Sequence, residues 1–407
     1  MLAAIAPALR SRNFRLFWFG QLISTTGASM QVVAEGWLIY SLTQSTFWLG
    51  MVGLLALIPV LPISLAGGVL IDRVPRRKLI MLTQTLLLVQ AAIFGLLGVS
   101  GHLRLWHIIV LYFFFGSILA IDHPARRAFL VELVEEKDLA NAVALNATLF
   151  NISSLVGYAM AGVLIATLGA GVTMLFNAAT YLAPITALAL IHTPDIVADA
   201  HIHGQQSQRF IHAIWEGVLT LWKQPMILGA ISLMAVVGGL TWPVFGLMPA
   251  YASEVMNAGA MGLGFLLAAG ALGSVLGTLS IARLSILGQG RALVAASLML
   301  PLFVIAFALS SDIWLSGALI VAVGALLLIL QSLAITLVQI NIPDRVRGRV
   351  MSLYSMLHAG ADTGSNAAIG ALAVYTGLPL ALVISGAAAL IYAVGLRVGL
   401  PAIREME

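Results

Sequence analysis

Long apolar runs, separated by short polar stretches, recur along the whole chain of 407 residues. A membrane-spanning helix needs roughly 20 mostly apolar residues, because it rises about 1.5 Å per residue across about 30 Å of hydrocarbon. Two of the runs are long enough for two helices each, and polar or glycine residues divide them at 43–46 and 169–171. The pattern predicts twelve spans, at residues 15–42, 47–70, 79–100, 105–124, 141–168, 172–192, 226–252, 259–282, 291–310, 313–340, 349–375 and 379–400.

The composition supports the membrane interpretation. Hydrophobic residues make up 61% of the chain and charged residues 9%, whereas a soluble globular chain is about a quarter charged. The run that starts at Phe14 is too long for the apolar region of a signal peptide, so we expect it to be the first span. The chain has no cysteine, which excludes disulfides and thiolate metal sites.

The basic residues fall almost entirely on one side of the predicted topology. With a cytoplasmic N-terminus, nineteen of the 20 Lys and Arg residues lie on the cytoplasmic side, and Arg104 is alone on the other. Cytoplasmic loops of membrane proteins carry this excess. We therefore expect both termini in the cytoplasm, and we attribute the net charge of +4 to topology rather than to a nucleic-acid partner.

The sequence is organised as two similar halves. A polar stretch at 193–225 separates six predicted spans from six, and related segments recur about 210 residues apart, as with Arg73 and Arg283. We expect an N-terminal six-helix bundle at 1–192, a cytoplasmic linker with a helix in the membrane interface at 193–225, and a C-terminal six-helix bundle at 226–407. The interfacial helix is predicted from apolar residues on one face: Phe210, Ile214, Val218 and Leu221.

The stretch "GGVLIDRVPRRKLI" concentrates five charges between the second and third predicted spans. Its pattern of Gly68, Asp72, Arg73 and Arg76 resembles the signature loop of the major facilitator superfamily, with Pro75 where that family usually has glycine. Segments such as "SRNFRLFWFGQLIS" and "PARRAFLVELVEEKDLANAVALN" are similar to the bacterial branch of enterobactin-type siderophore exporters, macrolide efflux pumps and lysophospholipid transporters. The resemblance covers essentially the whole chain and implies the major facilitator fold, an all-α membrane protein of two pseudo-symmetric six-helix bundles.

The charged loop is predicted to gate transport. Gly68 allows close helix approach, and Asp72 can accept hydrogen bonds from a helix N-terminus, which the resemblance places on span eleven. We expect Arg73 or Arg76 to pair with Asp122 at the cytoplasmic end of span four and to hold the two halves together there. In the alternative interpretation, Arg76 and its basic neighbours only fix the topology.

Three acidic residues, Glu35, Asp122 and Asp362, lie inside predicted spans, where a charge costs about 2.5–3.5 kcal/mol on insertion scales. Asp122 already has the structural role in gating given above. Glu35 shares a helical face with Gln31. In the alternative interpretation the Glu35 side chain reaches the outer membrane surface. Asp362 has His358 one turn away. In the alternative interpretation Asp362 serves packing only, either protonated or hydrogen-bonded to Asn366. We expect Asp362, Glu35 and His358 to couple protons to transport. Further residues are expected to line the cavity: Gln31, Asn146, Trp242, Gln331, Gln339, Tyr354 and Asn366.

The sequence contains no motif for covalent chemistry, such as a glycine-rich phosphate loop ending in Lys-Ser/Thr, a metal-ligand cluster or a nucleophile–base pair. We therefore expect a transporter rather than an enzyme, with no metal and no cofactor. The favoured function is proton-coupled export (antiport) of a small amphipathic compound, such as a drug or siderophore, by a monomer in the inner membrane. The alternative is a lysophospholipid flipping protein or a uniporter without obligatory proton coupling. A receptor or scaffold would leave the intramembrane acids unexplained.

Overall fold

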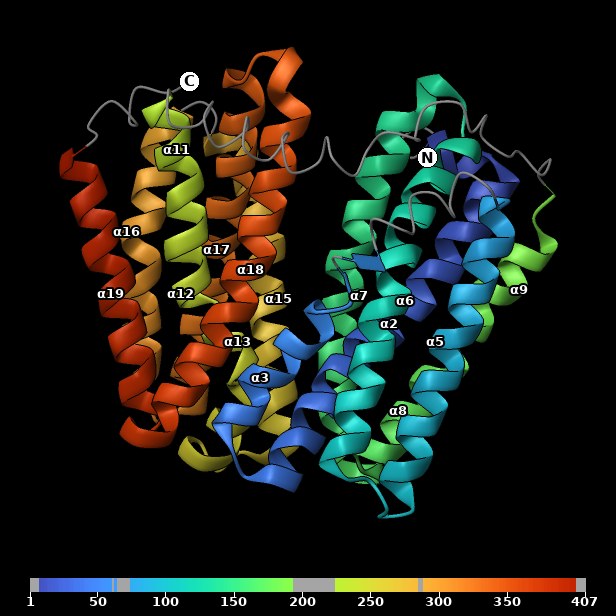
Figure 1. Cartoon of the computed structure of the whole chain (residues 1–407), viewed down its shortest axis with the longest axis horizontal. Coiled ribbons are helices and arrows are strands. Elements are labelled where there is room, and N and C mark those ends of the chain that lie inside the picture. The colour runs from blue at the N-terminus through green and yellow to red at the C-terminus, as the bar shows by residue number, and fades with distance from the viewer. Residues whose placement is uncertain (1–6, 61, 64–73, 193–223, 285–287, 400–407) are drawn as a thin grey trace. The chain divides into compact units, whose positions relative to one another are not determined.

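The computed structural model describes residues 7–60, 62–63, 74–192, 224–284 and 288–399, and these form helices and their connections without a strand (Figure 1). Nine helices in these ranges are long and apolar enough to cross a membrane. Two further helices, α2 (Arg12–Thr43) and α18 (Asp344–Thr376), coincide with two other predicted spans but carry more polar residues. The predicted linker helix and the first part of the charged loop, up to residue 73, lie outside the described ranges.

The chain divides into two compact units. Unit 1 comprises Met1–Gln44 and Val52–His203, and unit 2 comprises Ser45–Met51 and Gly204–Glu407. The helix α3 (Thr46–Leu57) therefore contributes residues to both units. The other helices of unit 1 are α2 (Arg12–Thr43), α5 (Arg76–Val99), α6 (Leu105–Glu132), α7 (Leu139–Leu168), α8 (Ala170–Thr180) and α9 (Leu182–Leu190), with short 3-10 turns at Pro7–Arg10 and Glu136–Asp138.

In unit 1, α2 packs against α7, α8 and α9, and α5 packs against α6 and α8. Small residues allow these close approaches. A Cβ atom on Gly157 of α7 would collide with the backbone of Thr26 on α2, and Ala161, one turn later, is fully buried. The stretch "GYAMAG" in α7 thus serves helix packing, as small residues do in membranes.

The described part of unit 2 contains five long helices. α15 (Gly259–Leu284) and α16 (Gln289–Ala308) both contact α17 (Ile313–Asn341), and α19 (Leu378–Gly399) contacts α16 and α18 (Asp344–Thr376). The contact between α15 and α17 depends on glycine. A Cβ atom on Gly273 of α15, or on Gly324 of α17, would strike a backbone oxygen of the facing helix.

The predicted span at 226–252 is interrupted rather than continuous. Proline has no N–H to donate to the preceding turn. Pro243 is the first residue of one short helix, and Pro249 is the second residue of the next. Two segments, Leu233–Gly238 and Tyr251–Val255, form π-helix instead of α-helix. The helical pieces are α11 (Pro225–Ser232), α12 (Gly239–Thr241), α13 (Pro243–Gly246) and α14 (Met248–Ala250).

Two other boundaries also differ from the prediction. The predicted span at 105–124 continues as α6 to Glu132, because Pro124 lies inside the helix without ending it. Asp122 therefore lies within a helix rather than at its end. The predicted span at 172–192 consists of α8 and α9, which are separated at Tyr181.

α5 shows the arrangement that a bilayer imposes. Its buried side includes Gln84 and Gln90, which are 0% and 4% exposed. Its exposed side is a stripe of large apolar side chains: Leu82, Leu86, Val89, Ile93 and Leu96. Soluble proteins place apolar side chains inside and polar ones outside. The reverse arrangement in α5 fits a bilayer, because lipid favours exposed apolar side chains and penalises exposed amides. The chain is therefore a multi-pass membrane protein.

Candidate functional sites

Glu35 lies in the interior of unit 1, where it is 2% exposed. The predicted pair with Gln31 is present, with Gln31 Nε2 donating to Glu35 Oε1 over 2.6 Å. The hydroxyl of Tyr112 on α6 donates a second hydrogen bond to the same carboxyl group. The alternative in which Glu35 reaches the membrane surface is therefore wrong.

Gln31 extends this cluster to two more helices. Its amide nitrogen also lies 3.3 Å from Gln90 Oε1 on α5, and its carbonyl oxygen accepts a hydrogen bond from Asn177 Nδ2 on α8. Asn177 in turn accepts from the hydroxyl of Thr180, at 3.2 Å. We call Gln31, Glu35, Gln90, Tyr112 and Asn177 the Glu35 network. A buried acid whose partners are all neutral carries no opposite charge to offset its own when ionised.

Asp122 forms a second buried cluster in unit 1. Its side chain is fully buried, and its Oδ1 accepts hydrogen bonds from Thr83 Oγ1 at 2.5 Å and Gln84 Nε2 at 2.9 Å. Its other oxygen lies 2.5 Å from Nε of Arg126, one turn along α6. The same guanidinium donates to Oε1 of Gln21 on α2.

This cluster corrects the predicted pairing of the gating loop. Arg76 pairs with Glu132 at 2.5 Å, at the end of α6, and the partner of Asp122 is Arg126. The extension of α6 beyond residue 124 explains the change, because it brings Arg126 one helical turn after Asp122. Gly68, Asp72 and Arg73 lie outside the described residues.

Asp362 and His358 form the predicted pair on α18 in unit 2. Nδ1 of His358 lies 3.0 Å from Oδ2 of Asp362, and the two side chains are 31% and 15% exposed. The ring of Tyr354 packs edge-on against His358, and its hydroxyl donates to the backbone carbonyl of Gln331 on α17 at 3.2 Å. The histidine, rather than Asn366, is thus the residue that pairs with Asp362.

The remaining predicted cavity residues are dispersed. Asn366 packs against Gly50 and Gly246 within unit 2, and its buried Oδ1 has no hydrogen-bond partner among the described residues. Trp242 is half-buried with its ring 5.7 Å from that of Phe245. Gln339 is exposed near the end of α17. Asn146 lies in unit 1, in a cleft between α2, α6 and α7.

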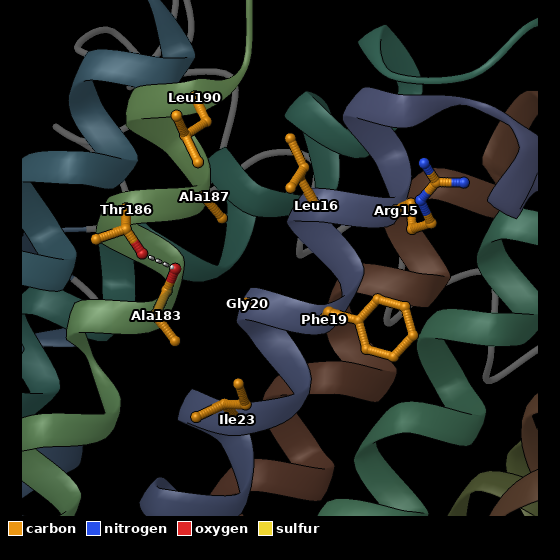
Figure 2. A pocket seen from close by; sticks show the side chains of 9 residues that line it. All are labelled: Arg15, Leu16, Phe19, Gly20, Ile23, Ala183, Thr186, Ala187 and Leu190. Carbon is orange, nitrogen blue, oxygen red and sulfur yellow. Dashed lines mark hydrogen bonds between the residues drawn. The ribbon is translucent and has the colours of Figure 1, made fainter.

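Unit 1 carries two clefts of similar size but different chemistry. The cleft between α2, α6 and α7 has a volume of about 410 Å³ and includes Gln21, Arg126 and Arg127 in its lining. The other, about 400 Å³, lies between α2 and α9 (Figure 2). Its one charged lining residue is Arg15, which points away from α9, and the hydroxyl of Thr186 bonds the carbonyl of Ala183.

Comparison with known families identifies the chain. The model of the transmembrane secretion effector family, a branch of the major facilitator superfamily, matches residues 2–407. The chain belongs to this family. The match confirms the resemblance that the charged loop and the flanking segments indicate.

Relatives of the chain carry transport names. It is 25% identical over 401 residues to the multidrug efflux pump Tap of Mycolicibacterium fortuitum, covering 96% of each chain. It is also 25% identical to the enterobactin exporter EntS of Escherichia coli, over 88% of this chain and 85% of that protein. Over 45% of the chain it is 26% identical to the staphyloferrin A transporter of Staphylococcus aureus, and over 44% of that protein.

Solved structures agree on the fold of the secretion effector. A bacterial homologue of the iron transporter ferroportin, in an inward-facing state, superposes with a TM-score of 0.72 at 17% identity, over 95% of this chain and 98% of that one. A POT family transporter in complex with 5-aminolevulinic acid gives 0.75 at 14% identity, over 97% of both. These similarities show the major facilitator fold.

Sequence reasoning missed several residues of the two buried clusters. The pair of Asp122 and Arg126 follows from a spacing of four on one helix, which the sequence displays. Gln84 and Gln90 are conspicuous amides in an apolar run, so their burial was predictable. Their partners on other helices were not, because tertiary contacts leave no trace in spacing along one helix.

Proposed function

We propose that this secretion effector is a proton-coupled exporter of a small amphipathic compound, working by alternating access in the inner membrane with both termini in the cytoplasm. The relatives named as an efflux pump and a siderophore exporter support export of small molecules. The pair of Asp362 and His358 is the observation that carries the proton coupling, since it combines two titratable groups at 3.0 Å on a helix predicted to span the membrane.

The physical basis of coupling is the response of a carboxylate to water. A carboxylate that loses water favours its neutral form, and a neighbouring cation or restored water favours the charged form. Imidazole changes charge near physiological pH, so His358 is suited to supply that cation or to pass the proton. In alternating access, opening to one side and then the other changes water access to such a site. Protonation of Asp362 then depends on which side is open.

Glu35 has a second role in this proposal. Its carboxyl group connects, through Gln31, to α5 and α8, and Tyr112 connects it to α6. A proton gained or lost at Glu35 therefore changes hydrogen bonding among four helices of unit 1. We propose that this network communicates protonation to helix packing.

The charged loop keeps its proposed gating role on the cytoplasmic side. Arg76, at the first position of α5, is tied to Glu132 on α6, so the basic end of the loop is anchored to unit 1. Asp72 is proposed to bind a helix N-terminus of the C-terminal half. Arg73 and Gly68 keep the gating roles that the sequence predicts for them.

Transport by purified protein in proteoliposomes tests the function. Thermal-shift screening of drugs, siderophores and lysolipids first selects a substrate, because a ligand that binds the folded state raises its apparent stability. We expect an imposed pH gradient to concentrate that substrate and a protonophore to abolish the concentration. Equilibration that never exceeds the external concentration, with no effect of the protonophore, would support the uniporter or lysophospholipid-flipping alternative.

A further inference from the structure

The cleft between α2, α6 and α7 combines positive charge with a buried hydrogen-bond donor. Arg126 and Arg127 line it, and the lining residues in the described part of the chain include no acid. Asp122 lies behind Arg126 and offsets one of the two positive charges. Arg127 is exposed and His123 stands beside it on the same helix. The lining is therefore electropositive.

Gln21 is the second observation that points to a ligand. Its side chain is 3% exposed and lines the cleft, and its Oε1 accepts a hydrogen bond from Arg126. Among the residues that the structure describes, its Nε2 has no hydrogen-bond partner. A buried donor without an acceptor costs free energy, so an acceptor that enters the cleft would remove that cost. Asn146, half-buried on α7, adds a further amide to the lining.

Apolar groups line the rest of the cleft. Phe17 and Leu149 are buried in its lining, at 3% and 1% exposure, while Val143 and Phe150 are 55% and 46% exposed. The volume of about 410 Å³ lies in the range of about 300–1,000 Å³ that is typical of small-molecule sites. A ligand that fits must present acceptor oxygens to Gln21 and the arginines and an apolar body to the phenylalanines.

We propose that this cleft binds an anionic group, such as a carboxylate, sulfonate or phosphate, carried on an apolar body. Both a soluble amphipathic anion and an anionic lipid have this chemistry. The proposal does not depend on proton coupling, because binding to unit 1 is measured without transport.

A single cysteine at the exposed Val143 tests the site, since the chain otherwise has none. The Val143→Cys protein is purified in phosphatidylcholine nanodiscs and labelled with methanethiosulfonates of opposite charge, one sulfonated and one trimethylammonium. We expect Arg127→Gln to lower the ratio of anionic to cationic labelling rates by about 5- to 10-fold, from the loss of one nearby charge. Circular dichroism checks that each variant is folded.

Protection by a ligand tests binding itself. Naphthalene-2-sulfonate should slow labelling of Val143→Cys, while uncharged naphthalene-2-methanol should not. Gln21→Leu, which removes the unpartnered donor and keeps the side-chain size, should abolish the protection. Ile23→Cys, in the cleft between α2 and α9, is the matched control and should not be protected.

The lipid composition distinguishes the two sources. If an anionic lipid occupies the cleft, phosphatidylglycerol nanodiscs slow labelling before any sulfonate is added. If a soluble anion is the ligand, the labelling rate is the same in both lipids and only naphthalene-2-sulfonate slows it. Equal protection of Val143→Cys and Ile23→Cys, or protection that survives both Gln21→Leu and Arg127→Gln, would overturn the proposal.

Discussion

Glu35 and Asp362 are both acids on long helices, but the chain surrounds them differently. Glu35 is 2% exposed, and its network draws on α5, α6 and α8 as well as on its own helix. The side chain of Asp362 is 15% exposed, and its partner His358 comes from one turn earlier on the same helix. Tertiary packing holds the first acid, whereas helical spacing alone positions the second.

We expect the two acids to differ in role: Asp362 exchanges the proton, and Glu35 changes hydrogen bonding between helices when its charge changes. Asp362 has the more exposed side chain, and its titratable partner lies on the same helix. Glu35 has neutral partners on other helices, so a change in its charge must rearrange hydrogen bonds between helices. We therefore expect removal of the acid at Asp362 to affect coupling most, and changes around Glu35 to affect both rate and stability.

The largest effect is expected for Asp362→Asn. The amide keeps the size of the side chain but cannot exchange a proton, so transport driven by a pH gradient should be abolished while substrate binding remains. Proteoliposome uptake and thermal-shift titration measure the two properties separately. Asp312→Asn is the matched control, because Asp312 caps α17 by accepting from the Leu315 amide at 2.7 Å, and asparagine caps helices equally well.

Glu35→Gln should have the next largest effect. Glutamine can keep a hydrogen bond to Gln31 but loses the titratable proton, so we expect the initial rate of gradient-driven transport to fall about tenfold, which corresponds to about 1.4 kcal/mol. A complete loss in this variant, with normal transport in Asp362→Asn, would reverse the two assignments. Concentration of substrate by both variants would remove proton coupling from both acids.

The contrast between the two acids also explains what the sequence could predict. The pairs Gln31 with Glu35 and His358 with Asp362 were predictable, because residues four apart on a helix share a face. The apolar runs located nearly every helix, since the bilayer fixes their length and polarity. These features depend only on local spacing.

Features that depend on other helices were not predictable. Gln90, Tyr112 and Asn177 stand far apart in sequence, and only the packing of α5, α6 and α8 brings them to Glu35. Asp122 pairs with Arg126 and not with the predicted Arg76, while the other predicted partner, Arg73, lies outside the described residues. The predicted span ended at residue 124, whereas α6 continues through Pro124 to Glu132.

Gln31→Leu should lower stability more than it lowers transport. The substitution removes hydrogen bonds to Glu35, Gln90 and Asn177 and leaves their buried polar atoms unpartnered, which we expect to cost about 1–3 kcal/mol. Thermal unfolding of the purified protein, followed by tryptophan fluorescence, measures the change. His358→Leu is the comparison in unit 2 and should destabilise less, because water can reach Asp362 when its partner is removed. Equal losses would show that the two acids are held alike.

The smallest effects are expected for two matched substitutions, Tyr112→Phe and Tyr354→Phe, each of which removes one hydroxyl. The Tyr112 hydroxyl bonds the Glu35 carboxyl group, whereas the Tyr354 hydroxyl bonds only a backbone carbonyl, that of Gln331, among the contacts of the described residues. Each loss should cost about 0.5–1.5 kcal/mol of stability. Only Tyr112→Phe should also change the pH dependence of transport, because only this substitution removes a hydrogen bond made to a titratable group. Initial rates measured across a series of pH values, with stability followed in parallel, separate the two variants. A shifted pH profile for Tyr354→Phe and an unchanged one for Tyr112→Phe would place the proton-sensitive step entirely at α18.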